Sequence, residues 1–188
     1  MLLCLLLLGC SAWPAEQAQA NGLQITNAER LPAPDRDLIR FDLGWQNSCY
    51  VSGLPANHDA VWVFIKFRAC GAGAGIQWDH ALLSTTMGDH TLSAELAFAT
   101  PIETTDRQGN PGQHNTGAMI RRADFGTGNL IDEACTLRVV GSSGGNPFDP
   151  AVDYDIEVLG TEMVEIKGGA PFVVGDVGGW SNQSKGSG

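Results

Sequence analysis

The chain is poor in basic residues. It has 11 Lys and Arg residues against 21 Asp and Glu residues, which gives a formal net charge of −10. Proteins that bind nucleic acids usually present clustered Lys and Arg side chains, because these neutralise the phosphate backbone. The acidic composition therefore argues against nucleic acid as a partner and is typical of a surface that keeps a domain soluble.

The patterns that usually indicate a catalytic or metal site are missing. The four histidines form no H-x-H or H-x-x-x-H pair, and the cysteines lack the C-x-x-C spacing of a zinc site. Ser84, Ser142 and Ser143 lack the strand and helix context of a nucleophile elbow. The glycine-rich residues 141–145 lack the lysine and the following helix of a phosphate-binding loop. We therefore expect no catalytic residue and no cofactor within this chain.

Long hydrophobic runs are absent apart from the leucines at the N-terminus. Residues 2–8 are too few to span a bilayer, and residues 18–20 have the Ala-Gln-Ala pattern that signal peptidase accepts. We expect residues 1–20 to be a signal peptide and the mature protein to be secreted or on the cell surface, with no transmembrane segment. Alternatively, residues 7–10 form a lipoprotein box, and Cys10 carries a lipid anchor.

Three cysteines follow the predicted signal peptide, namely Cys49, Cys70 and Cys135. Three thiols allow at most one internal disulfide, which an oxidising compartment favours. Cys70 directly follows one expected strand and Cys135 begins another. If these strands run in opposite directions, the two cysteines lie close together. We therefore predict a disulfide between Cys70 and Cys135 and a free thiol at Cys49.

Alternating hydrophobic residues predict β-structure. Residues 39, 41, 43 and 45 are Ile, Phe, Leu and Trp, separated by polar residues or glycine, and this period of two is typical of a strand with one buried face. Residues 61–68 are rich in β-branched and aromatic residues and predict a central strand. Glycine-rich residues 71–75 predict a hairpin that returns toward Leu83. Weaker strands are expected near residues 92–98, 118–123, 135–140 and 154–159.

Short strands separated by turn residues favour an all-β fold, and we predict an antiparallel β-sandwich, Ig-like or related. We assign this domain to residues 21–160. Residues 100–116 and 141–149 are expected to be exposed loops. Residues 161–188 are expected to be either the start of a second, truncated domain or a flexible tail.

An acidic cluster near the C-terminus is a weak candidate for a calcium site. Asp149, Asp153 and Asp155 surround Pro150 and could supply the oxygen ligands that calcium prefers. Their spacing differs from the twelve-residue calcium loop, and acidic turns before a strand are common. A structural role for these three carboxylates is therefore the alternative.

Three tryptophans occupy adjacent predicted strands. If Trp45, Trp62 and Trp78 were exposed in a row, they would resemble a platform for carbohydrate. Packing in the core is the more frequent use of tryptophan on central strands, and it is the alternative here.

Two regions of the sequence resemble a known family. Residues 41–48 (FDLGWQNS) and 59–67 (DAVWVFIKF) resemble the N-terminal β-domain of secreted bacterial proteins that continue into a formylglycine-generating-enzyme (sulfatase-modifying factor) domain. Residues 162–175 (EMVEIKGGAPFVVG) resemble the opening of that second domain, although Lys167 replaces the usual proline. The resemblance implies an oxidase whose copper-binding cysteines lie far downstream of these residues, so no catalytic residue is transferred to this chain.

The residues present favour a secreted accessory, adhesion or ligand-binding module. Its expected partners are carbohydrate or protein at the cell surface. Two alternatives stay open, which are the N-terminal fragment of a formylglycine-generating-type oxidase and the subunit of a surface filament or homo-oligomer.

Overall fold

The computed structural model describes residues 22–31, 37–52, 57–70, 77–105, 111–112, 114–142, 145 and 147–164. The predicted signal peptide, including Cys10, and residues 165–188 of the predicted C-terminal segment lie outside the described residues. The strands are β1 (Gln24–Arg30), β2 (Leu38–Val51), β3 (Asn57–Ala69), β4 (Asp79–His80), β5 (Leu82–Leu83), β6 (Thr91–Leu92), β7 (Leu96–Phe98), β8 (Gly117–Arg122), β9 (Gly126–Val140) and β10 (Tyr154–Val164), with the short 3-10 helix η2 (Met87–Asp89) before β6.

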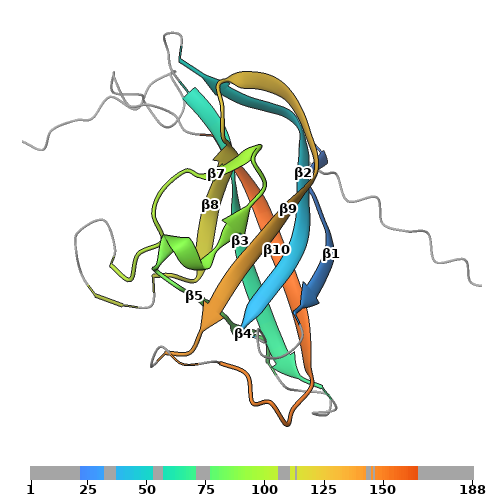
Figure 1. Cartoon of the computed structure of the whole chain (residues 1–188), viewed down its shortest axis with the longest axis vertical. Helices are drawn as coiled ribbons and strands as arrows, with labels where there is room; N and C mark the ends of the chain where they lie inside the picture. Colours follow the sequence, from blue (N-terminus) through green and yellow to red (C-terminus); the bar gives the residue numbers. More distant parts are fainter. Residues whose placement is uncertain are drawn as a thin grey trace, which may run out of the picture.

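The strands form one antiparallel sheet that curls into a half-barrel (Figure 1). The main path through the sheet is β5-β9-β2-β3-β8-β7, while β1 pairs with β2 and β10 pairs with β3. The prediction of an antiparallel all-β fold is confirmed. The two-layer sandwich is not confirmed, because hydrogen bonds between β2 and β3 connect all these strands into a single sheet. β10 also continues through the expected domain boundary at residue 160 to Val164.

β2 and β3 are paired at only one end. Their pairs are Tyr50 with His58 and Val51 with Asn57, next to the loop that joins them. Over the rest of its length β2 pairs with β9 on one side and β1 on the other, whereas β3 pairs with β10 and β8. The two strands therefore diverge, and the hydrophobic core fills the space between the two halves of the sheet.

The core is built from the alternating residues of the long strands. Residues 39, 41, 43 and 45 of β2 are at most 1% exposed, and residues 61, 63 and 65 of β3 are fully buried. The strands predicted around both sets are confirmed. β1 covers the open side of the core beside β10, since an added Cβ at Gly160 would lie only 2.9 Å from Cδ1 of Ile25.

A buried carboxylate holds the paired ends of β2 and β3 together. Asp59 is 7% exposed, and its Oδ2 accepts a hydrogen bond from Nε1 of Trp45 at 2.9 Å. Its Oδ1 accepts from the backbone N–H of Cys49 at 2.9 Å and from Oγ of Ser48 at 3.4 Å. Nε of Arg122, on β8, donates to the same Ser48 hydroxyl at 3.3 Å. One side chain of β3 therefore connects the end of β2 to β8.

The predicted disulfide between Cys70 and Cys135 is not present, because all three described cysteines are free thiols. Cys135 is fully buried within β9 opposite Phe41, whereas Cys70 is exposed just beyond β3. β3 and β9 both run antiparallel to β2 and hence parallel to each other. The assumption that their strands run in opposite directions was wrong. Burial raises the pKa of the Cys135 thiol to about 12.

We expect Asp59→Asn to lower the free energy of unfolding by about 1–3 kcal/mol, because the amide replaces an accepting oxygen with a donor that faces other donors. Urea unfolding followed by circular dichroism measures this change. Asp124→Asn, at an exposed position in the turn before β9, is the matched control and should change stability by less than about 0.5 kcal/mol. Equal unfolding midpoints for the two variants would contradict the role given to Asp59.

Candidate functional site

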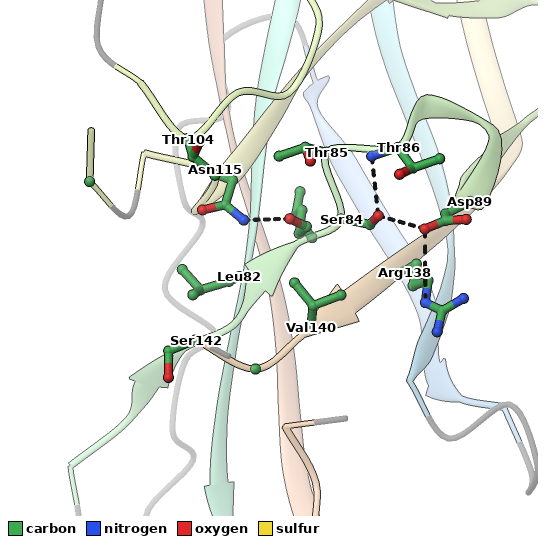
Figure 2. Close-up of a pocket in the computed structure, with 13 residues that line it drawn as sticks. Leu82, Ser84, Thr85, Thr86, Asp89, Thr104, Asn115, Arg138, Val140 and Ser142 are labelled. Carbon is green, nitrogen blue, oxygen red and sulfur yellow. Dashed lines mark hydrogen bonds and ion pairs between the residues drawn. The ribbon is translucent and has the colours of Figure 1, made fainter. Parts of the chain in front are cut away.

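A pocket of about 480 Å³ lies where β5 meets the end of β9 (Figure 2). Leu82 and Val140, which pair across the two strands, form an apolar part of its wall. Five residues with hydroxyl groups also line it, and these are Ser84, Thr85, Thr86, Thr104 and Ser142. The pocket is therefore lined by both aliphatic and hydrogen-bonding groups.

The pocket exists because the chain changes partner strands over a very short distance. β4 pairs with β3 through Asp79 and His80, whereas β5 pairs with the end of β9 through Leu82 and Leu83. Between them Ala81 is 1% exposed, and Leu83 is fully buried in the core. This crossing carries the loop that begins at Ser84 over to β9, where it meets Arg138.

A polar network fixes that loop. Oγ of Ser84 donates a hydrogen bond to Oδ2 of Asp89 at 2.5 Å and accepts one from the backbone N–H of Thr86 at 3.2 Å. Nε of Arg138 lies 2.7 Å from Oδ2 of Asp37 and 4.0 Å from Oδ2 of Asp89. The Ser84 proton is thus held by a carboxylate. Arg138 is paired with Asp37, and Asp89 adds a second negative charge to the group.

His90 lies behind the same loop and is 8% exposed. Its Nε2 lies 2.8 Å from the carbonyl oxygen of Ser84, which can only accept, so Nε2 carries the proton. Its Nδ1 accepts from the backbone N–H of Arg138 at 3.1 Å. Both ring nitrogens are engaged and the ring is neutral, so His90 joins the loop to β9 and is not placed to take a proton from the Ser84 hydroxyl.

Asn115 supplies the most buried amide of the pocket, at 5% exposed. Its Nδ2 donates to the carbonyl oxygen of Leu83 at 2.5 Å, and the backbone N–H of Leu83 donates to the Asn115 carbonyl oxygen at 2.8 Å. Because the Leu83 oxygen can only accept, the amide orientation is fixed. Oδ1 then points away from Leu83 (Figure 2).

The three candidate calcium ligands are not brought together. Oδ1 of Asp149 accepts from the backbone N–H of Ala151 at 2.9 Å, which is a local turn contact. Asp155 accepts from Nε of Arg68 at 2.9 Å, and hydrogen bonds from Arg68 and Cys70 hold the pKa of its carboxyl below the usual range. The carbonyl oxygen of Asp153 accepts from the backbone N–H of Cys70. Within the part of the chain that is described, no group of three or more His, Cys, Asp or Glu residues could hold a metal ion.

The three tryptophans do not form one exposed row. Trp45 is 1% exposed and lies in the core. Trp62 is half-buried and lies across Gly117 of β8, where an added Cβ would be 2.5 Å from the indole. Trp78 is half-buried beneath the guanidinium of Arg68, whose Cζ is 4.5 Å from the ring centroid. The alternative of core packing holds for Trp45.

The burial of His90 predicts a pH-dependent stability. Burial lowers the pKa of His90, and the contact with the Ser84 carbonyl and the charge of Asp89 oppose this only in part. The unfolded chain therefore takes up a proton at higher pH than the folded chain. The contribution of His90 is fully present above about pH 6.5 and is lost as the pH falls below that value.

We expect His90→Gln, which keeps a donor and an acceptor but does not titrate, to lose less stability than the parent protein between pH 7 and pH 5. Urea unfolding at several pH values measures the stability of the variant and of the parent. The carboxylates titrate alike in both proteins, so their contribution cancels when one pH profile is subtracted from the other. His80→Gln, at an exposed position on β4, is the control and should keep the parent's pH dependence. Identical pH profiles for His90→Gln and the parent would contradict the assignment.

No helix among the described residues is long and apolar enough to cross a membrane. The resemblance to the formylglycine-generating-enzyme family rests on the sequence motifs alone. Comparison of the chain with known proteins finds no matching family model, no matching curated protein and no matching solved structure.

Proposed function

We propose that this protein is a secreted, non-catalytic binding module whose pocket between β5 and β9 takes a small, uncharged, polyhydroxylated molecule such as a sugar residue. The observation that carries the proposal is the amide of Asn115. Asn115 lines the pocket; its Nδ2 and its backbone are used in contacts with Leu83, while Oδ1 points away from Leu83. A ligand hydroxyl can donate a hydrogen bond to this oxygen.

The rest of the lining disfavours an anionic ligand and offers groups that suit a sugar. Arg138 is already paired with Asp37 and lies near Asp89, so the pocket offers no unbalanced cation for an anionic ligand. Hydroxyl groups such as that of Thr104 can donate and accept, as sugar hydroxyls do. Leu82 and Val140 provide an aliphatic surface for the C–H groups of a sugar ring. A volume of about 480 Å³ falls in the range usual for small-molecule sites.

The arrangement of the polar groups supports binding rather than catalysis. The hydroxyl of Ser84 donates to a carboxylate that is itself near Arg138, so its proton is stabilised where it is. His90 has both nitrogens engaged with backbone groups. The leucine run and the Ala-Gln-Ala motif at residues 18–20 support export, which would expose the module to extracellular carbohydrate.

Chemical-shift titration with glucose, galactose, mannose and N-acetylglucosamine tests this proposal. We expect at least one of these sugars to shift the side-chain amide signals of Asn115 in a saturable way. Thr85→Phe places a bulky ring at an exposed position of the pocket lining and should weaken binding at least about tenfold, a change of about 1.4 kcal/mol. Thr161→Phe, at an exposed position of β10, should bind as the parent does.

Two results would contradict the proposal. One is that none of the four sugars shifts the Asn115 signals up to its solubility limit. The other is that Thr85→Phe binds as tightly as Thr161→Phe, which would show that the ligand lies elsewhere on the molecule.

A further inference from the structure

An exposed aromatic ring lies at the end of the sheet farthest from the pocket. Phe125 occupies the turn between β8 and β9 and is 63% exposed. β9 begins next to it with Gly126, which pairs with Tyr50, and ends with Val140 in the pocket lining. About 14 residue steps of strand, roughly 45 Å along β9, therefore separate this ring from the pocket.

The ring of Phe125 packs against Tyr50, and Tyr50 in turn contacts Arg121. Its centroid lies 4.3 Å from that of Tyr50, with 32° between the ring planes. Cζ of Arg121 lies 4.1 Å from the Tyr50 centroid. Nη1 of Arg121 in turn donates to the carbonyl oxygens of Arg122 at 2.5 Å and Ala123 at 3.1 Å. A ring held in this way loses little conformational entropy when a ligand binds to it.

Polar residues whose side chains could reach the rim of a ligand lie on both sides of Phe125 in the sequence. Asp124, Thr127 and Asn129 are all exposed. Oδ1 of Asn129 accepts a hydrogen bond from the backbone N–H of Asn47 at 3.1 Å, which fixes the amide and directs its Nδ2 to donate elsewhere. The end of the sheet thus combines an aromatic face with nearby carboxylate, hydroxyl and amide groups.

We propose that the stack of Phe125, Tyr50 and Arg121 is a second carbohydrate contact, independent of the pocket, that binds the face of a sugar ring in a neutral polysaccharide. The face of an aromatic ring is electron-rich and attracts weakly positive C–H groups. A pyranose presents such C–H groups on its face and hydroxyls around its rim. Phe125 matches the face, and the polar side chains beside it match the rim.

Other partners fit this surface less well. The guanidinium of Arg121 lies against Tyr50 and repels a cationic ligand such as a quaternary amine.

A protein partner also fits poorly. A stable protein interface buries about 800 Å² on each partner. The large hydrophobic side chains that are exposed at this end, among the described residues, are Phe125, Ile131 and Met163, which pairs with Ala60 near the start of β3. They are too few for the apolar centre of such an interface.

Retention on insoluble polysaccharides tests the inference, with cellulose, chitin, xylan and mannan as the probes. We expect the parent protein to be retained on at least one of them, and Phe125→Ala to lower the apparent affinity about three- to tenfold. Ile131→Ala is the matched control, because it removes a hydrophobic side chain of similar exposure from β9, the strand that follows Phe125, and it should bind as the parent does. Phe125→Trp should restore binding, and its fluorescence should change when the polysaccharide is added.

The pocket variant separates this inference from the proposed function. Thr85→Phe should keep the retention of the parent, because the pocket and the stack lie at opposite ends of β9. Loss of retention in Thr85→Phe would assign the polysaccharide to the pocket and overturn the second contact while leaving the proposed function intact. Equal retention of Phe125→Ala and Ile131→Ala, or no retention of the parent on any of the four polymers, would also overturn it. A dimer of the parent that Phe125→Ala dissociates would assign the surface to self-association instead.

Discussion

The buried carboxylate of Asp59 is the constraint on which the shape of this protein depends. A buried carboxylate is tolerated only when its oxygens accept hydrogen bonds, and here the donors come from one short segment of β2. Trp45 and Cys49 can both reach the same carboxylate because β2 is irregular between them. Asn47 has a φ of 56°, and the register of β2 against β9 shifts between Trp45 and Ser48. The end of β2 thus bends around Asp59 and stays beside β3, while the remainder of the two strands diverges.

The divergence also explains why the pocket lies at the other end of the molecule. Where β2 and β3 are apart, the chain after β3 must cross from one half of the sheet to the other, and β4 and β5 make this crossing around the buried Ala81. A loop that leaves the sheet in this way carries backbone groups that need partners. His90 donates to one of them, the carbonyl oxygen of Ser84, and accepts from the N–H of Arg138 on β9. The loop is therefore fixed against β9, and the pocket beside it has a defined shape.

The period of two in β2 and β3 was readable from the sequence because each of these strands has one face in the core, and their burial alternates with few exceptions. The start of β9 was not readable, since residues 126–129 are Gly-Thr-Gly-Asn and resemble a turn. The structure keeps them in the strand through irregular backbone, with φ of 132° at Gly128 and 51° at Asp132, and through pairing with β2.

The pocket was not readable either, because its polar groups come from separate segments near Ser84, Asn115 and Arg138 that only the strand order brings together. The failed disulfide has the same origin, since relative strand direction is a property of the topology and not of the local sequence.

Asn115 differs from the other polar residues of the pocket in how its side chain is used. The connection to β5 needs one donor toward the Leu83 carbonyl oxygen, and Nδ2 supplies it. Oδ1, the other half of the amide, points away from Leu83 (Figure 2). Ser84 and His90 differ in this respect, because their hydrogen-bonding groups face the loop and β9. Of these three polar residues, therefore, Ser84 and His90 hold the site in shape, and under the proposed function Asn115 presents the hydrogen-bonding atom that a ligand meets.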